Sequence, residues 1–339
     1  MKRALTLSIL VCAINVSAPQ AQQPASRIHK LAELRWPQIA ALDRDRTMFV
    51  LPMGMLEEHG PHLPIGSDTF GVTFEADGVA RRVARSLPQW NVVVMPPIEY
   101  GQGGANIIGG QQVHPGTYGI RQSTLRALVA DVGGQVAQNR FKWIFVLTGH
   151  ASPPNGMAVN EACDFVSQSF DVAMLHVSGL FRGDPAIQAR GRELTARFFS
   201  PAQIASLGLD VHAGAAETSV NLALRPQLVP SSYRKLPPLS GATREELQKV
   251  ASQSGWQGYL SAPAQATAAY GRAVEAWWVD GLSELVLRAV KGEDLSKAPR
   301  AHDRIDPEVS SIVGKALDHE QAFETKFEEW LSRRRQQSR

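Results

Sequence analysis

Short apolar runs that alternate with helix-prone segments are the feature that most constrains the fold of this 339-residue chain. Such runs cover Thr47–Pro52, Asn91–Pro96, Trp143–Leu147 and Asp171–Val177. They lack the alternating polar positions of a strand with one solvent-exposed face, so we expect strands that are buried on both faces. The sequence therefore predicts an α/β fold, mainly a parallel sheet with helices on both faces.

Helices are expected between and around these strands, because apolar residues recur there at helical spacing. The expected helices are 28–41, 68–87, 120–139, 157–170, 213–224, 274–290 and 316–339, and residues 182–209 are also helix-prone. Pro153 and Pro154 are expected to delay the helix that begins at Met157. Residues 100–119, rich in Gly and Gln, are expected to form an irregular loop, and residues 231–255 a surface connection.

The N-terminal residues 1–21 have a basic start, an apolar stretch over about 5–16 and small residues after it. This pattern predicts a secretory signal peptide and a periplasmic or secreted protein, since the apolar stretch is too short to span a membrane. The alternative is a disordered or fraying N-terminal helix. No lipid or membrane anchor is expected, because Val11 precedes Cys12 where a lipoprotein signal carries a small residue.

Composition excludes some classes of function. The formal net charge of +3, with 20% charged and 44% hydrophobic residues, is that of an ordinary globular protein. It lacks the large excess of positive charge that is typical of nucleic-acid-binding proteins. Removal of the signal peptide leaves Cys163 as the remaining cysteine, which excludes an internal disulfide. We expect Cys163 to be a small buried apolar residue.

A cluster of ionisable residues follows the first predicted strand, within the stretch Leu51–Phe70. Its members are Glu57, Glu58, His59, His62 and Asp68, separated by Gly and Pro turns. Mixed carboxylate and imidazole donors suit Zn²⁺, Mn²⁺ or Fe²⁺ better than Ca²⁺ or Mg²⁺, which prefer oxygen alone. The cluster therefore favours a metal site over a solvated surface loop.

His150 strengthens the metal interpretation. It closes the predicted strand Trp143–Leu147 in the sequence Thr-Gly-His. A single histidine at such a place is more often a hydrogen-bonded structural residue. However, the carboxyl ends of parallel strands meet at one edge of the sheet, so we expect His150 over the same crevice as the Glu57 loop.

Residues 54–68, GMLEEHGPHLPIGSD, resemble the signature of the creatininase family of metal-dependent amidohydrolases, G-S-x-E-Q-H-G-P-H-L-P followed by an Asp. Further segments resemble family motifs in the same order: residues 114–117 (HPGT), 147–150 (LTGH) and 212–219 (HAGAAETS), and more weakly 258–271. The resemblance covers roughly residues 36–290. It implies one hydrolase domain over 28–292. The predicted signal peptide, 1–21, and a charged helical C-terminal extension, 293–339, lie outside the resemblance.

The resemblance also implies a three-layer creatininase-like fold that holds two divalent metal ions bridged by a carboxylate and a water. Zinc is expected, with manganese or iron as alternatives. By the same resemblance, Glu57 and His150 hold one metal ion, His59 holds the other, and Asp68 bridges them.

His212 is then the candidate acid/base that protonates the departing amine. Glu217 is implied as a ligand of the second metal or as a carboxylate that orients a ligand. Glu58 stands at the family's Gln position, so no metal bond is expected from it. Pro61 and His62 are expected to shape the loop.

Two departures from the family pattern concern the substrate. Creatinine-hydrolysing members have a Glu ligand two residues after the motif histidine, where this chain has Ser152, and Glu217 is our choice for the missing ligand. Those enzymes also have a Trp just after the strand that corresponds to residues 171–177, where this chain has Ser178 and Gly179. We therefore expect creatinine to be a poor substrate, and His150, Ser152, Ser178 and His212 to lie in the half of the site that fixes the substrate.

The resulting hypothesis is an exported dinuclear-metal amidohydrolase that cleaves a cyclic amide, a formamide or a similar small-molecule amide, and that assembles as a homo-oligomer. It acts on carbon–nitrogen bonds other than ordinary peptide bonds. Two alternatives stay open: a non-catalytic metal- or ligand-binding protein on the same scaffold, and a metal-dependent lactone or ester hydrolase.

Overall fold

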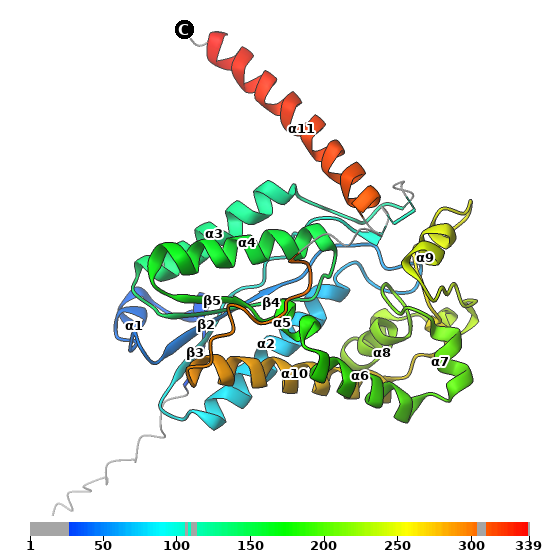
Figure 1. Ribbon diagram of the computed structural model, residues 1–339, viewed down its shortest axis with the longest axis horizontal. Coiled ribbons are helices and arrows are strands. Elements are labelled where there is room, and N and C mark those ends of the chain that lie inside the picture. The colour runs from blue at the N-terminus through cyan, green and yellow to red at the C-terminus, as the bar shows by residue number, and fades with distance from the viewer. Residues whose placement is uncertain (1–26, 106–107, 110–113, 304–309, 338–339) are drawn as a thin grey trace, which may run out of the picture.

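A parallel sheet with helices on both faces forms the body of the protein (Figure 1). The computed structural model describes residues 27–105, 108–109, 114–303 and 310–337, so the expected signal peptide lies outside the described residues. The strands are β1 (Ile28–Lys30), β2 (Thr47–Met53), β3 (Asn91–Val94), β4 (Trp143–Thr148) and β5 (Ala173–His176). They lie in the order β1-β3-β2-β4-β5, and each pairing is parallel. The predicted α/β class is therefore confirmed.

The helices connect and cover these strands. They are α1 (Trp36–Ala40), α2 (Ser67–Ser86), α3 (Gln122–Gln138), α4 (Pro153–Phe170), α5 (Val177–Gly183), α6 (Pro185–Phe198), α7 (Pro201–Leu207), α8 (Ala215–Leu224), α9 (Arg244–Ala251), α10 (Ala268–Val290) and α11 (Ser310–Gln337). Short 3-10 turns occur at η1 (Leu31–Glu33), η3 (Pro226–Leu228), η4 (Ser231–Lys235) and η5 (Pro263–Gln265).

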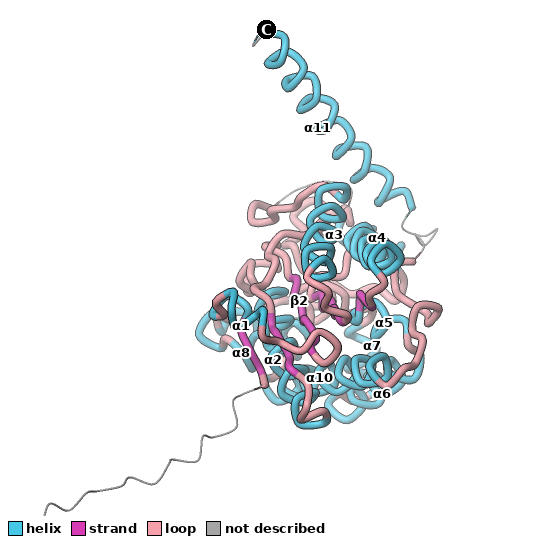
Figure 2. The backbone as a smooth tube through the Cα atoms, turned by 90° about the vertical axis from the view of Figure 1, so that its left-hand side faces the viewer, coloured by secondary structure: helices cyan, strands magenta, loops and turns pink. Residues whose placement is uncertain are grey.

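Strand β2 shows why the predicted strands are apolar throughout. Met48 and Val50 point to a core cluster shared with α2, α5 and α10, whereas Phe49 and Leu51 point to a second cluster shared with α3 and α4. The two helical layers lie on opposite sides of the strands (Figure 2). Because successive side chains of a strand face opposite ways, a strand covered on both faces has no polar positions.

The carboxyl ends of β2 and β4 lie side by side, since Met53 pairs with Thr148 in the parallel register. The loop after β2 carries the predicted ligands Glu57 and His59, and His150 follows β4 directly. The sheet therefore brings these segments, which are far apart in the sequence, to one edge.

The predicted helix 28–41 is wrong in its first half. Residues Ile28–Lys30 form β1, which pairs with β3 as an edge strand, and α1 begins only at Trp36. A strand of three residues is too short to show a period of two, so the apolar pattern could not distinguish it from a helix.

Other boundaries also differ from the prediction: α10 begins at Ala268 and α11 at Ser310, each six residues before the predicted start. Helix α4 begins at Pro153, not at Met157, because a proline in the first turn has no intrahelical hydrogen bond to lose. The predicted surface connection 231–255 contains α9, whose Leu247 and Ala251 are buried. The prediction for Cys163 is confirmed, since this cysteine is free and buried in α4.

The chain beyond α10 returns over the body before α11 leaves it. Arg300 forms a two-pronged ion pair with Asp164 of α4, with distances of 2.8 and 2.9 Å. Asn160 donates to the carbonyl of Ala301 at 3.1 Å. Helix α11 then stands away from the body (Figures 1 and 2). Among the described residues, no helix has the length and apolar character needed to cross a membrane.

Candidate metal centre

Glu57, Asp68 and His150 form the first group of possible metal ligands, and all of them are buried. Nδ1 of His150 lies 2.8 Å from Oε2 of Glu57 and 3.3 Å from Oδ2 of Asp68. On the other side of the ring, the Nε2 atom is 3.1 Å from the carbonyl oxygen of Gln102, to which an N–H there donates. His150 therefore turns Nδ1 toward the carboxylates and uses Nε2 to hold its orientation.

His59, Asp68 and Glu217 form the second group. Nε2 of His59 lies 3.4 Å from Oδ1 of Asp68 and 3.6 Å from Oε2 of Glu217. Its Nδ1 is 3.0 Å from the carbonyl oxygen of Glu57, which accepts the N–H there. Asp68 therefore belongs to both groups, with one carboxylate oxygen nearer to each histidine.

Helix starts and a glycine bring the acidic ligands to the strand ends. Asp68 lies in the first turn of α2 and Glu217 in the first turn of α8, where a negative charge is favourable. Gly149, at the end of β4, lies so close to α2 that a Cβ atom on it would be 2.4 Å from the carbonyl oxygen of Asp68. Only glycine permits this approach, which sets His150 next to Asp68.

The charges of the cluster are strongly coupled. Burial alone would raise the pKa of Glu57, but the charges of His150 and His212 lower it to about 2. Burial would likewise raise the pKa of Asp68, yet His59 and His150 hold it well below its usual range. Burial would lower the pKa of His150, but Glu57 and Asp68 raise it to about 10. The buried carboxylates thus require neighbouring positive charge.

The donor atoms of this cluster fit metal ions. Nε2 of His59 and Oδ2 of Asp68 are buried and have no hydrogen-bond partner within the described part of the chain. His59 Nε2 lies beside Oδ1 of Asp68, and Oδ2 of Asp68 lies beside His150. Buried polar atoms in native proteins are almost always paired, so these two atoms need another partner. A divalent cation would supply both the missing partner and the positive charge, and mixed imidazole and carboxylate donors suit zinc or manganese.

His212 lies on a third side of the same cluster. Its Nδ1 is 3.7 Å from Oε1 of Glu57, and its ring centre is 4.4 Å from that of His59. Burial lowers the pKa of His212 to about 4, which keeps the imidazole neutral at pH 7. Burial raises the pKa of Glu217 to about 7. His212 also forms a possible ligand group with Glu57 and His59, so its place allows proton transfer or ligation.

Glu58 and His62 belong to none of the ligand groups among the described residues. Glu58 accepts a hydrogen bond from the Gly60 N–H at 3.0 Å, and burial raises its pKa. His62 Nε2 lies 2.9 Å from Oγ1 of Thr218, which ties the loop after β2 to α8. Both side chains hold the shape of the loop.

The expected role of Ser178 in fixing the substrate is wrong. Ser178 is fully buried, and its hydroxyl oxygen accepts a hydrogen bond from the Thr148 N–H at 2.9 Å, so it supports the end of β4. Ser152 donates its hydroxyl to the carbonyl of Gln102 and lies in none of the ligand groups. Sequence reasoning missed Gln102, because a main-chain carbonyl can come from any residue type.

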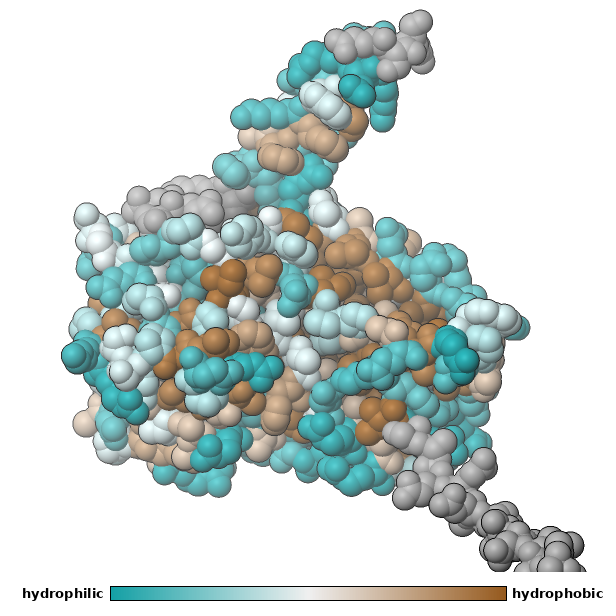
Figure 3. Space-filling view, turned by 180° about the vertical axis from the view of Figure 1, so that it is seen from behind, coloured by the Kyte–Doolittle hydropathy of each residue, from teal (hydrophilic) through white to brown (hydrophobic). Residues whose placement is uncertain are grey.

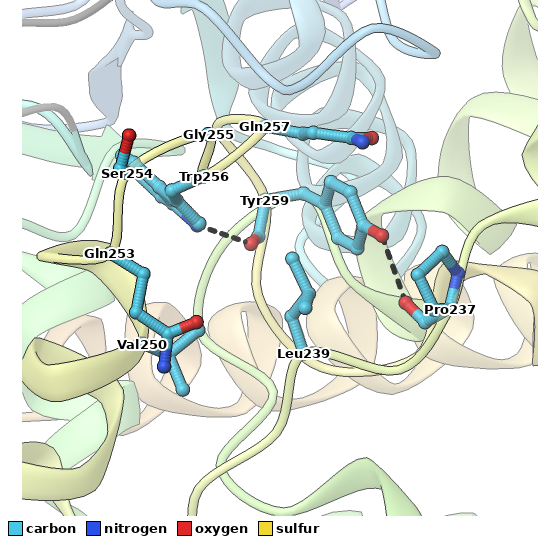
Figure 4. A pocket seen from close by; sticks show the side chains of 9 residues that line it. All are labelled: Pro237, Leu239, Val250, Gln253, Ser254, Gly255, Trp256, Gln257 and Tyr259. Carbon is cyan, nitrogen blue, oxygen red and sulfur yellow. Dashed lines mark hydrogen bonds between the residues drawn. The ribbon is translucent and has the colours of Figure 1, made fainter.

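A small pocket lies near the centre but does not include it (Figure 4). Its volume is about 100 Å³, and none of the possible metal ligands lines it. In its wall the Tyr259 hydroxyl donates to the Pro237 carbonyl and the Trp256 indole N–H to the Tyr259 carbonyl, each at 2.8 Å. These bonds fix the loop at Gly258, where a Cβ would be 2.3 Å from Oε2 of Glu58. The segment that lines the pocket therefore also holds the loop that packs against Glu58.

Comparisons with known proteins agree with this geometry. The family model for creatininase, described as creatinine amidohydrolase, matches residues 32–286. A mycofactocin precursor peptide peptidase from Mycobacterium ulcerans (strain Agy99) is 28% identical over 79% of this chain and 96% of its own. The creatinine amidohydrolase of Pseudomonas putida is 30% identical over 59% of this chain and 73% of its own.

A solved structure described as "Creatininase Mn" shares the fold. It is 25% identical, has a TM-score of 0.56 and covers 78% of this chain and 99% of its own. The matched region ends before the last turn of α10, so the C-terminal segment with α11 lies outside the family model.

Proposed function

Because the chain belongs to the creatininase family of hydrolases, we propose that it is an exported amidohydrolase with a dinuclear metal centre. It cleaves a carbon–nitrogen amide bond in a small molecule. The observation that carries this proposal is the position of Asp68, whose two oxygens belong to two separate ligand groups. Such a shared carboxylate is what a pair of neighbouring metal ions requires.

Each side chain of the cluster has its own task in this proposal. Glu57 and His150 would hold one metal ion, His59 and Glu217 would hold the other, and Asp68 would be shared. When bound, the divalent ions would supply a water of lowered pKa as the nucleophile and would polarise the substrate carbonyl. The ligand set favours zinc, and the relative described as "Creatininase Mn" makes manganese the main alternative.

His212 moves the proton. Its neutral imidazole can accept a proton at neutral pH and pass it to the departing nitrogen, which must leave as an amine and not as its anion. The free atom is Nε2, which is buried without a hydrogen-bond partner in the described structure and lies 4.0 Å from Oε1 of Glu58.

The substrate is the least constrained part of the proposal. The relatives are named for a peptide and for creatinine, so cyclic amides, formamides and short peptides all belong in a test. We expect creatinine itself to be a poor substrate. Ser152 offers a hydroxyl where the creatinine enzymes have a carboxylate, and the buried Ser178 presents no aromatic surface.

Chelation tests the proposal directly. The purified protein is expected to hold close to two metal ions per chain, to lose amidase activity with a strong chelator and to regain it with Zn²⁺ or Mn²⁺. Activity that survives complete metal removal would sink the mechanism. Full metal content without turnover of any amide, together with turnover of lactones or esters, would instead identify an ester hydrolase.

Export is proposed from the N-terminal sequence alone. Expression of the full chain with fractionation of the cells would place the mature protein in the periplasm or the medium, shortened near residue 21. An unshortened chain in the cytosolic fraction would refute export. Light scattering of the mature protein would test the proposed homo-oligomer.

A further inference from the structure

We propose that Glu320 of α11 is a positioning residue for His150, and that it acts through Gln102. This inference rests on the proposed function, because it takes His150 to be a metal ligand. Glu320 lies beyond residue 286, where the family match ends. The C-terminal helix would thus add to the metal centre a support that comes from outside the family domain.

Gln102 is the junction through which this support acts. It is only 1% exposed, and its carbonyl oxygen faces the Nε2 atom of His150 at 3.1 Å and also accepts the Ser152 hydroxyl. Its main-chain N–H donates to Oδ1 of Asn155 in α4 at 3.0 Å. Its side-chain amide donates to Oε1 of Glu320 at 2.6 Å. The main chain of Gln102 orients the ring of His150, and Glu320 holds the side chain of Gln102.

Glu320 is itself well placed to act as an anchor. Its second oxygen accepts the main-chain N–H of Gln122, the first residue of α3, at 2.8 Å. A carboxylate at a helix N-terminus is favourable, and both of its hydrogen bonds are charge-assisted. Glu320 therefore fastens two segments, the loop at Gln102 and the start of α3, to the base of α11.

The rest of α11 explains why a separate role for Glu320 can be tested. The helix projects from the body, so most of its surface contacts no other described segment (Figure 3). Glu324, one turn further along, forms an ion pair with Arg121 at 3.6 Å but touches neither Gln102 nor His150 in the described contacts. Replacing Glu324 weakens the attachment of α11 while leaving the link to His150 in place.

Groups that hold a metal ligand in orientation typically contribute 10- to 100-fold to metal affinity. The Gln102 carbonyl contacts His150 directly, whereas Glu320 acts on His150 only through Gln102. We therefore expect an effect of Glu320 on metal affinity at the lower end of that range. Loss of the Glu320 carboxylate should lower the affinity for the metal ion at His150 by about tenfold, and should leave the affinity for the ion at His59 nearly unchanged.

The experiment uses the full mature chain and three single variants, Glu320→Ala, Glu320→Gln and Glu324→Ala. Zn²⁺ affinity is measured by competition with a coloured chelator, and the visible absorption of the Co²⁺-loaded proteins reports ligand geometry. We expect Glu320→Ala to lose about tenfold in affinity for one ion and to shift the Co²⁺ bands. Glu320→Gln keeps one acceptor oxygen but places an NH2 group against the second donor, so it should recover the affinity and the bands in part, and Glu324→Ala should match the wild type.

A double-mutant cycle guards against a general loss of folding. Gln102→Met removes the side-chain amide but keeps the main-chain carbonyl, so it should lower the affinity for the same metal ion as Glu320→Ala does. The double variant should be no weaker than either single variant, because both changes break one link. Additive losses, or equal effects of Glu320→Ala and Glu324→Ala, would overturn the inference. A wild-type protein that binds no metal would instead overturn the proposed function.

Discussion

Replacement of Asp68 by asparagine is expected to empty both halves of the metal centre at once. Oδ1 of Asp68 lies 3.4 Å from His59 and Oδ2 lies 3.3 Å from His150, so the carboxylate is common to both ligand groups. Glu217→Gln alters only the group that contains His59 and Asp68, and Glu57→Gln removes the carboxylate that the proposed function assigns to the ion of His150. We therefore expect about two metal ions per chain in the wild type, one in each of these controls and none in Asp68→Asn.

The loss can be expressed as stability. A ligand that binds only the folded state at 100 times its Kd stabilises that state by about 2.7 kcal/mol per site. Two sites filled at that level add about 5 kcal/mol to the free energy of unfolding. Asp68→Asn should lose nearly all of this gain, and each control about half. The metal-free proteins serve as the baseline, because the substitution also changes the pairing of the two histidines.

Metal content by mass spectrometry and urea unfolding with and without Zn²⁺ measure the two quantities. If Asp68→Asn retained one ion and a gain of about 2.7 kcal/mol, Asp68 would serve one site only. If Glu57→Gln or Glu217→Gln lost both ions, the two ligand groups would not be separate. Either result would refute the assignment of Asp68 as the shared ligand.

Three further changes test other parts of the structure. Burial raises the pKa of Glu275 from 4.5 to about 9 and that of Glu75 to about 7, so the stability that depends on their protonated forms is complete below pH 4.5 and is lost as the pH rises through these values. Between pH 5 and 9 the free energy of unfolding of Glu275→Gln should therefore fall by about 1–3 kcal/mol less than that of the wild type, and the same pH dependence of urea unfolding in both proteins would contradict this. Gly149→Ala places a methyl group against the Asp68 carbonyl and should cost about 1–3 kcal/mol of stability together with metal affinity; normal metal content and unfolding would show that the close approach is not needed. His212→Ala should keep both metal ions but lower turnover by about 10²–10⁴-fold, and wild-type turnover would remove His212 from the proton path.

The parallel sheet could be predicted because its evidence is local. Each central strand is an apolar run long enough to recognise, as in Trp143–Leu147, and the alternation with helices implies parallel pairing. The edge strand Ile28–Lys30 could not be predicted, because three residues carry no period and its pairing with β3 depends on a segment about sixty residues away. Tertiary pairing, and not local preference, decides such a strand.

The metal centre, too, has residues that could be predicted from the sequence and residues that could not. Glu57, His59, Asp68 and His150 stand in recognisable motifs, and a parallel sheet brings the ends of β2 and β4 together. Gln102 carried no signal, because its contribution to His150 is a carbonyl oxygen in an irregular loop rich in glycine. Side-chain chemistry can be read from a sequence, whereas the supporting main-chain atoms become visible only in the fold.

The two histidines of the centre turn opposite ring nitrogens toward the carboxylates, Nδ1 in His150 and Nε2 in His59. The ¹⁵N resonances of an imidazole distinguish these two atoms. Loading of one metal site should therefore shift a δ1 signal, and loading of the other an ε2 signal. The order in which the two ions enter, and any cooperation between them through Asp68, could be followed in one labelled sample without a substitution.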